Sequence, residues 1–376
     1  MNFDRVSQMD EAGEKRARLT RAMKERGLDA VVLSRRHNFS WASGGSDNHV
    51  RHSADMGVAT LIFTRDGARY VLTSNIEAPR IMDEELGGMG YELKTVKWYV
   101  PEERAQALKE LMGGRKAASD DGTPGTVDAE PLLMPLRMQL GRNELAKYRW
   151  LGRAAGRGIA EVCRKITRGM TEEEIAGNLF AVMQGQGVKP TVLLVAADER
   201  IKKYRHPIPT AQKVKGAVML VLCARRWGLV TSTTRIVGFG RPSDEVKYKH
   251  EACTFVDACF IAASRPGVPL VDVFNRARAA YGERGYPDEW QFHHQGGPTG
   301  YIEREFTVNP STDKALKVGR GMAIAWNPSI AGTKSEDTIL VTPSGTEVIT
   351  ASPGWPMLKV RVEGRTVARP DWLIKP

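Results

Sequence analysis

The sequence has 376 residues and is 41% hydrophobic and 26% charged, a composition typical of a globular protein with about two domains and a sizeable core. No apolar run approaches the roughly 20 residues that span a bilayer, and the charged opening segment 1–18 lacks the apolar core of a secretory signal. The net charge of +11 would allow a polyanionic partner, but acids are interspersed and no nucleic-acid motif occurs, which disfavours nucleic acid.

The four cysteines include no closely spaced CxxC pair of the kind that holds a metal. They stand in segments with a periodic apolar pattern, at Cys163, Cys223, Cys253 and Cys259. They are therefore predicted to be buried, reduced thiols of a cytoplasmic protein.

The first part of the chain alternates apolar strands with amphipathic helices, which predicts an α/β N-terminal domain over residues 1–138. Arg65, Asp66 and Gly67 are a hairpin-turn signal. Helices are expected at 14–27, 76–86 and 103–112, and strands at 28–33, 58–64 and 69–72. Turn-rich or polar loops are expected at 38–45 and 113–125, and a break at 131–141.

The remainder of the chain, residues 139–376, is predicted to form an α+β domain. A long amphipathic helix starts near Asn143 and stops at Gly169, and Thr171 with Glu174 forms a capping box for the next helix. The later pattern predicts strands at 192–195, 218–223 and 230–237, helices at 245–263 and 271–284, and strands at 322–326, 338–342 and 347–350. The closing tail contains Pro and Trp and is expected to be irregular.

Residues 293–306 hold more groups able to move a proton than any other stretch of their length. Two adjacent histidines, His293 and His294, precede a Gly-Gly-Pro turn, and further polar side chains follow it: Tyr301, Glu303, Arg304 and Glu305. Adjacent side chains of a strand point to opposite faces, so only one of the two histidines is expected to face a pocket. The alternative is a polar strand end whose histidines only pack.

The order of these landmarks resembles the creatinase/aminopeptidase P/methionine aminopeptidase family, whose catalytic domain has the pita-bread fold. Residues 19–45 are similar to its N-terminal domain, and residues 144–176 are similar to the opening helices of its catalytic domain. Four later signatures match, at Thr234-Arg235, Gly321-Met322, Asn327-Pro328 and Glu336-Asp337-Thr338. The resemblance covers nearly the whole chain and implies an α/β creatinase-like N-terminal domain followed by an α+β pita-bread domain.

Peptidases of that family hold two metal ions with two Asp, one His and two Glu. The resemblance places these five ligands, in that order, at Val221, Ser232, His294, Asn327 and Glu336. Three of the five are therefore replaced by uncharged side chains. Two dications need anionic oxygens to offset their charge, so neither a metal nor another cofactor is expected at this site.

Two further positions of the family's site can be followed in this chain. His206, before a Pro-containing turn, matches a substrate-facing histidine and is a candidate proton donor near neutral pH. A second substrate-facing histidine is replaced by Tyr301, whose hydroxyl could donate to a developing oxyanion. A single metal ion held by His206, His294 and Glu336 is left open as an alternative.

The family includes creatinase, which works without metal. That resemblance implies a metal-independent hydrolase or lyase that cleaves a C–N bond in a small amino-acid-like or amidine-like substrate. His206 and His294 are predicted to be the acid–base pair, with Glu336 holding the imidazolium. The candidate substrate-binding residues are polar or basic: Tyr301, Asn327, Ser232, Arg205, Arg225, Arg304, Glu305 and Arg51.

Arg51 lies in a polar loop that, in creatinase-like dimers, reaches the partner's site, so a homodimer with a shared site is expected. Two other functions stay open. The chain could be a catalytically inactive pita-bread protein that acts as a binding module, which salt-dependent polyanion binding would reveal. It could also be an Xaa-Pro-type metallopeptidase with a reduced metal site, which chelator-sensitive peptide cleavage would reveal.

Overall fold

The computed structural model describes residues 4–376, so residues 1–3 of the predicted N-terminal domain and of the charged opening segment lie outside the described residues. The chain divides into two compact units. The first contains the chain up to Glu144 together with Trp227–Leu229, and the second contains Leu145–Arg226 and Val230–Pro376. Within residues 4–376, none of the helices combines the length and the apolar character needed to cross a membrane.

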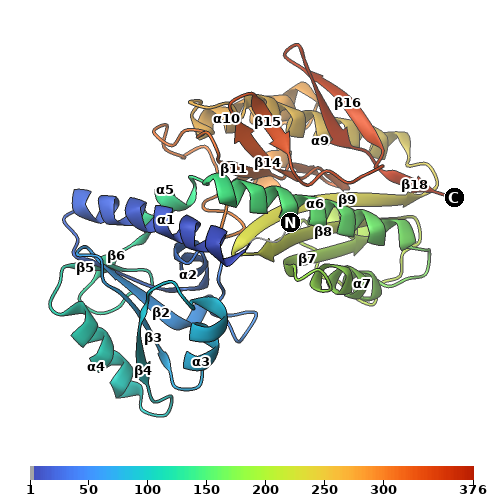
Figure 1. Ribbon diagram of the computed structural model, residues 1–376. Helices are drawn as coiled ribbons and strands as arrows, with labels where there is room; N and C mark the ends of the chain where they lie inside the picture. The colour runs from blue at the N-terminus through green and yellow to red at the C-terminus, as the bar shows by residue number, and fades with distance from the viewer. Residues whose placement is uncertain (1–3) are drawn as a thin grey trace. The chain divides into compact units, whose positions relative to one another are not determined.

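A six-stranded mixed sheet forms the centre of the first unit, in the order β4-β3-β2-β1-β5-β6 (Figure 1). The strands are β1 (Ala30–Arg35), β2 (Met56–Thr64), β3 (Arg69–Ser74), β4 (Glu92–Val96), β5 (Ala117–Ser119) and β6 (Val127–Asp128). The antiparallel pairing of β2 with β3 confirms the predicted hairpin. Val32, Ile62 and Leu72 from adjacent strands are fully buried together and form a core on this sheet.

Helices accompany this sheet: α1 (Arg5–Glu25), α2 (Arg36–Ala42), α3 (Ala78–Arg80), the π-helix η1 (Ile81–Glu85), α4 (Pro101–Met112) and α5 (Glu130–Arg137). The predicted turn at 38–45 is wrong, because α2 covers most of it. Asn38 is buried there, donates to Asp120 (2.9 Å) and accepts from Arg137 (2.7 Å), and these long-range contacts stabilise a short helix. The predicted break at 131–141 is confirmed only for residues 138–141, between α5 and the next helix. Its first part is wrong, since α5 carries Pro131 in its first turn, where a missing N–H is tolerated.

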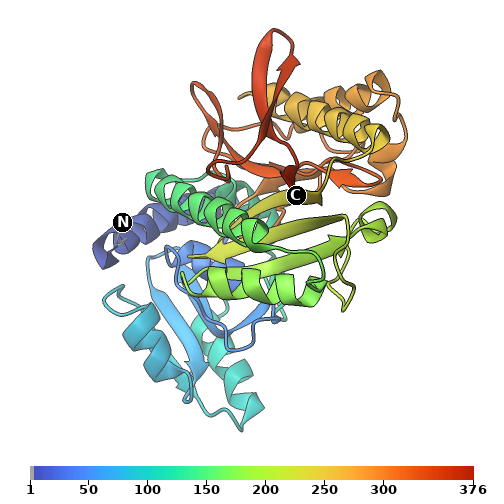
Figure 2. The same cartoon turned by 90° about the vertical axis from the view of Figure 1, so that its right-hand side faces the viewer.

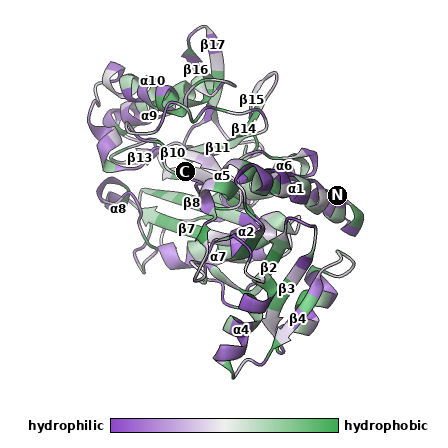
Figure 3. Cartoon of the chain, turned by 90° about the vertical axis from the view of Figure 1, so that its left-hand side faces the viewer, coloured by the Kyte–Doolittle hydropathy of each residue, from purple (hydrophilic) through white to green (hydrophobic). Residues whose placement is uncertain are grey.

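The second unit begins with two helices and a four-stranded sheet in the order β18-β9-β8-β7. Its elements are α6 (Arg142–Lys165), α7 (Glu172–Gln184), β7 (Lys189–Ala197), α8 (Glu199–Lys203), β8 (Ala217–Arg226), β9 (Leu229–Phe239) and β18 (Leu373–Lys375). The predicted capping box of Thr171 and Glu174 is confirmed. α7 packs against β7 (Figure 2). Hydrophobic residues concentrate on strands such as β7 (Figure 3), where Leu194 packs with Ile236 and Trp372.

A second sheet of this unit, β10-β11-β14-β15, accompanies the two predicted helices α9 and α10. The bounds are α9 (Asp244–Ala263), α10 (Leu270–Glu283), the 3-10 helix η2 (Glu289–Phe292), β10 (Gly296–Thr299), β11 (Ala323–Trp326), β14 (Asp337–Thr342) and β15 (Gly345–Val348). Two short hairpins complete the unit: β12 (Ser329–Ile330) with β13 (Thr333–Lys334), and β16 (Met357–Val362) with β17 (Arg365–Pro370).

The prediction of an irregular tail is wrong. Its Val360 and Val367 pair across the β16–β17 hairpin, and β18 adds to β9 as a parallel strand. Trp372 explains the placement, because its side chain is buried in the core cluster formed by β7, β8 and β9. Burial of a large aromatic side chain stabilises the folded tail. The mixed composition of the tail gives no sign of this contact, which is why its strands were not predicted.

A buried network of ion pairs links the tail to the rest of the second unit. Arg369 of β17 contacts Asp257 of α9 (2.6 Å) and Asp337 of β14 (2.8 Å). Asp337 also receives Arg235 of β9 (2.9 Å). The side chains of all four are at most 1% exposed, so this network joins a helix to three strands in the interior.

The buried imidazole of His250 on α9 predicts a pH-dependent stability. Its Nδ1 lies 2.7 Å from the Thr333 hydroxyl and its Nε2 lies 3.1 Å from the Pro370 carbonyl oxygen. Burial lowers the pKa of His250 from 6.5 to about 4. Between pH 6.5 and pH 4 the imidazole is therefore protonated in the unfolded chain but neutral in the folded chain. Stability should therefore fall as the pH drops from 6.5 towards 4, with about 3 kcal/mol from this group.

Thermal unfolding midpoints across that pH interval test this expectation. The His250→Gln variant keeps a donor and an acceptor but cannot titrate, so its midpoint should fall less steeply with acidification. An equal slope in both proteins would contradict the assignment.

Candidate functional site

The five positions that correspond to the family's metal ligands come together in the second unit. Val221 and Ser232 lie on the neighbouring strands β8 and β9, and His294 precedes β10. Asn327 directly follows β11, and Glu336 directly precedes β14. All except Ser232 line one cavity of about 500 Å³. These positions therefore define the candidate site.

Glu336 is surrounded by cations of the protein itself. Arg304 approaches one carboxylate oxygen (Nη2–Oε1, 3.1 Å) and Lys334 approaches the other (Nζ–Oε2, 2.9 Å). The Thr234 hydroxyl also donates to Oε2 (2.7 Å). Although burial disfavours the charged carboxylate, Lys334 and Arg304 lower the pKa of Glu336 to about 2. The carboxylate is therefore ionised and already neutralised.

The pair of divalent ions that the family implies does not fit these side chains. Val221, Ser232 and Asn327 provide no negative charge, and the one carboxylate among the five positions, Glu336, is ion-paired. Arg304 also donates to the Ser232 hydroxyl (3.0 Å), at a position where the family places an aspartate. Two dications would meet a guanidinium and an ammonium group here instead of anionic oxygens.

Two buried polar atoms in the wall of the cavity are unsatisfied. Neither Nε of Arg304 nor Oδ1 of Asn327 has a hydrogen-bond partner within residues 4–376. An unpaired buried donor or acceptor costs about 1–3 kcal/mol, so such groups are rare unless a ligand completes them. A donor with positive charge and an amide oxygen on the same cavity suit a ligand that carries a carboxylate and an N–H group.

Three histidines cluster next to this cavity: His206, His293 and His294. Nε2 of His206 lies 3.1 Å from Nε2 of His293, and the ring centroids of His293 and His294 are 4.7 Å apart. His206 and His294 line the cavity described above as well as a second cavity of about 400 Å³, which His293 also lines. The expectation that only one of the adjacent histidines faces a pocket is wrong. Both precede β10, outside any strand, so strand alternation does not apply.

The electrostatic surroundings keep these histidines neutral. Partial burial, followed by the charges of Arg304 and Lys334, lowers the pKa of His294 to about 4. Burial and Lys334 also lower the pKa of His206, and burial lowers that of His293 well below its ordinary value. At neutral pH each imidazole therefore has one nitrogen with a free lone pair.

The other predicted substrate-binding residues are dispersed. Arg205 lines the second cavity and is ion-paired to Glu289 (2.5 Å). Arg225 is buried at the end of β8, Tyr301 is 1% exposed, and Glu305 is partly buried. Within residues 4–376 neither cavity is lined by these three side chains. Arg51 is exposed in a turn of the first unit.

Sequence reasoning gave no site role to six residues of the cavity wall: Val192, Leu194, Cys223, Ile302, Glu303 and Lys334. Lys334 stands two positions before Glu336, and in extended chain this spacing places both side chains on one face. The sequence could therefore have predicted a positive charge next to Glu336. Cys223 likewise follows Val221 by two positions on β8. Burial raises the pKa of Cys223 to about 12, so its thiol stays protonated and is no nucleophile.

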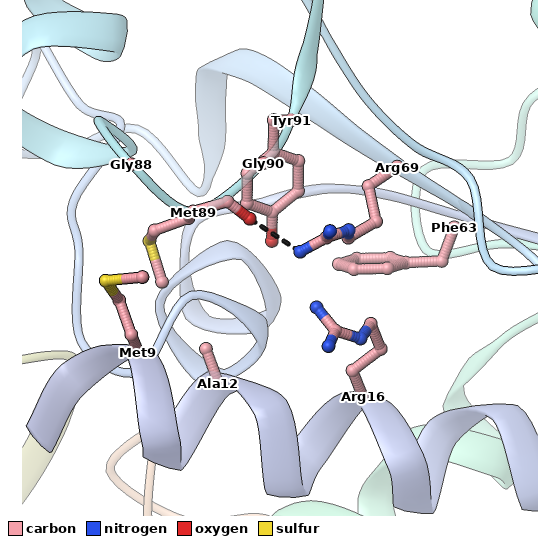
Figure 4. A pocket seen from close by; sticks show the side chains of 9 residues that line it. All are labelled: Met9, Ala12, Arg16, Phe63, Arg69, Gly88, Met89, Gly90 and Tyr91. Carbon is pink, nitrogen blue, oxygen red and sulfur yellow. Dashed lines mark hydrogen bonds between the residues drawn. The ribbon is translucent and has the colours of Figure 1, made fainter. Parts of the chain in front are cut away.

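A separate cavity of about 240 Å³ lies in the first unit (Figure 4). Arg16 and Arg69 point towards each other across it, with Phe63 and Tyr91 beside them. Arg69 donates to the Met89 carbonyl (2.5 Å). Among the residues from Asp4 onward, no carboxylate, histidine or cysteine lines this cavity, so these residues bring to it no side chain that exchanges protons near neutral pH.

The fold and the site together define a pita-bread protein with a creatinase-type N-terminal domain. Residues 146–343 match the family described as metallopeptidase family M24, and residues 15–126 match the creatinase/prolidase N-terminal domain. The chain belongs to this family, as the sequence resemblance predicted.

Among curated relatives, an uncharacterized peptidase of Staphylococcus aureus strain MW2 is 28% identical over 231 residues, which is 59% of this chain and 65% of that protein. The chain thus spans about 65% of the length of the curated relatives it matches.

Solved structures share the whole fold. The prolidase from Pyrococcus horikoshii OT3 has a TM-score of 0.77 at 19% identity and covers 90% of this chain and 98% of its own. The Xaa-Pro dipeptidase from Bacillus anthracis has a TM-score of 0.75 at 20% identity, with coverages of 97% and 100%. The N-terminal domain of the FACT complex subunit SPT16 from chickpea is also similar, with a TM-score of 0.69 at 12% identity and coverages of 91% and 96%.

Proposed function

We propose that this protein is a hydrolase of the Xaa-Pro peptidase type that cleaves a C–N bond in a small, carboxylate-bearing, amino-acid-like substrate, without the family's pair of metal ions. Membership of the M24 family and its peptidase relatives support the reaction class. The proposed substrate class rests on one observation: Arg304 Nε and Asn327 Oδ1 lie buried in the cavity wall without a hydrogen-bond partner among residues 4–376.

Each group has a distinct task in the proposed reaction. Arg304 binds the substrate carboxylate, and Asn327 accepts a hydrogen bond from a substrate N–H. One imidazole of His206 and His294 accepts a proton as water adds to the carbonyl carbon, and the imidazolium formed in this way returns that proton, directly or through the other imidazole, to the nitrogen as the C–N bond breaks. Glu336 does not contact either imidazole in the way first expected, since Lys334, Arg304 and Thr234 are its partners. Its task is to hold Arg304.

Replacing Arg304 with methionine tests the substrate class. A charge-assisted hydrogen bond contributes about 1.5–3 kcal/mol, so the Arg304→Met variant should lose roughly tenfold to a hundredfold in kcat/KM for an Xaa-Pro dipeptide. The same dipeptide with a C-terminal amide should be cleaved slowly by both proteins, with little further loss in the variant. The Arg265→Met variant, at an exposed position of the same unit, serves as the matched control.

Equal losses on the acid and the amide would contradict a carboxylate site at Arg304. If the protein cleaved no Xaa-Pro dipeptide in a set with varied first residues, the proposed function would be wrong.

This histidine-only mechanism, which the neutralisation of Glu336 by two cations favours, predicts cleavage that persists after exhaustive dialysis against a chelator. A peptidase with a reduced metal site is the second candidate, which the peptidase relatives favour, and it predicts cleavage that the chelator abolishes. The binding-module alternative predicts no cleavage at all and polyanion binding that weakens steeply with salt.

The expected homodimer, with the segment around Arg51 at the partner's site, stays a prediction. Light scattering would give the oligomeric state, and a charge-reversed Arg51 with unchanged kinetics would remove that segment from the site.

A further inference from the structure

Three of the chain's seven histidines converge on one point of the second unit. One ligand nitrogen of each of His206, His293 and His294 lies within 4.8 Å of the other two. His293 is buried, whereas His206 and His294 are exposed towards the two adjoining cavities. A buried anchor with two accessible partners is an arrangement in which an ion can enter and be held.

The shortest contact of the cluster has the dimensions of a metal site. With Zn–N bonds of about 2.0–2.1 Å at a tetrahedral angle, two ligand nitrogens lie about 3.3–3.4 Å apart. Nε2 of His206 and Nε2 of His293 are 3.1 Å apart, close to that value. In the metal-free protein one of these nitrogens must carry the proton that the other accepts, and an ion would replace that proton. A rotation of the exposed His294 ring would complete the set.

A hydroxyl group next to the cluster orients its buried imidazole. Nδ1 of His293 lies 3.1 Å from the Ser329 hydroxyl, which fixes the ring and leaves Nε2 for a ligand. Arg205 pairs with Glu289, whereas Arg304 and Lys334 share Glu336, so one positive charge near the cluster is not offset and an ion would have to be held by the imidazole nitrogens.

We propose that His206, His293 and His294 bind a single divalent ion of the zinc class, with its fourth position open to the substrate cavity. Three nitrogen ligands and an open position are typical of catalytic zinc sites and are also suited to cobalt, nickel or copper. The site differs from the family's dinuclear centre in two of its three ligands. It deepens the proposed function, on which its catalytic role rests, and makes His206 and His294 ligands of the ion in place of an acid–base pair.

The alternative set of His206, His294 and Glu336 is less suitable. Glu336 would have to release Arg304 and Lys334, which leaves two cations beside the ion. His293 has no ion pair to break, and its ring is already 3.1 Å from that of His206 at Nε2.

Cobalt titration of chelator-treated full-length protein tests the site independently of turnover. Visible absorption should appear and saturate at one equivalent of Co²⁺, and Zn²⁺ should abolish it stoichiometrically. The His293→Gln variant should bind Co²⁺ more than about a hundredfold more weakly, and Ser329→Ala should bind it about 10–100-fold more weakly. His250→Gln, at another buried histidine of the same unit, and Glu336→Gln should keep the stoichiometry.

Saturation at two equivalents, or a loss in Glu336→Gln with full binding in His293→Gln, would overturn the three-histidine site in favour of the family's centre. Absence of a cobalt spectrum in the folded wild type would also overturn it. Because Ser329→Ala leaves all three ligands in place, it remains informative if His293→Gln fails to fold. Cobalt binding without dipeptide cleavage would support the three-histidine site and contradict the proposed function. Cleavage without cobalt binding would support the proposed function and contradict the three-histidine site.

Discussion

Replacing Arg369 with methionine should lower the free energy of unfolding by about 3–5 kcal/mol, the range found when one partner of a buried ion pair is removed. Arg369 has an exposed fraction of 0% and bridges Asp257 and Asp337 at 2.6 and 2.8 Å. Methionine fills similar space without charge, so both carboxylates would stay buried while only Asp337 keeps a cation, Arg235. The effect should be large because desolvation of an unpaired carboxylate is costly.

The midpoint of urea unfolding measures this change. Arg365→Met is the matched control, since Arg365 is exposed on the same strand and should change stability by no more than about 0.5 kcal/mol. Similar midpoints for the two variants would show that the buried network contributes little beyond filling space.

The second large effect concerns the reaction. The His206→Ala variant should lose roughly 10²–10⁴-fold in kcat/KM, the usual contribution of a positioned acid–base group. His206 borders both cavities and lies 3.1 Å from His293, so its removal takes away a proton-transfer group of the site or, if the three histidines hold an ion, one of its ligands.

Steady-state kinetics on the best dipeptide substrate measure the loss, with His250→Gln as the control assayed above neutral pH. The His206→Ala loss should fall mainly on kcat, because the group acts in the transition state. Unchanged kcat with a raised KM would assign His206 to substrate binding alone.

Much of the fold could be predicted from local patterns. The capping box at Thr171 and the hairpin signal at Arg65-Asp66-Gly67 predicted a helix start and a hairpin that the structure contains. Both signals could be recognised because they depend only on residues that are close in sequence. Helix α2 and the tail strands could not be predicted this way. Asn38 is held by Asp120 and Arg137, and Trp372 by a core formed from distant strands.

The site shows the same division. The five ligand positions followed from ordered signatures, and four of them line the cavity. The approach of His293 to His206 could not be predicted, because the two are 87 residues apart and lie outside regular strands. The same holds for Arg304, which lies 32 residues from Glu336 in sequence but binds its carboxylate.

The ion pair between Arg304 and Glu336 limits how the family's dinuclear centre could be built into this chain. An aspartate placed at position 232 alone would face the guanidinium that now lies 3.0 Å from the Ser232 hydroxyl, and would form a salt bridge with Arg304 before it met a metal. Acids at positions 221, 232 and 327 would be needed together with the removal of Arg304. A single acidic substitution at this site therefore adds an ion pair and not a metal ligand.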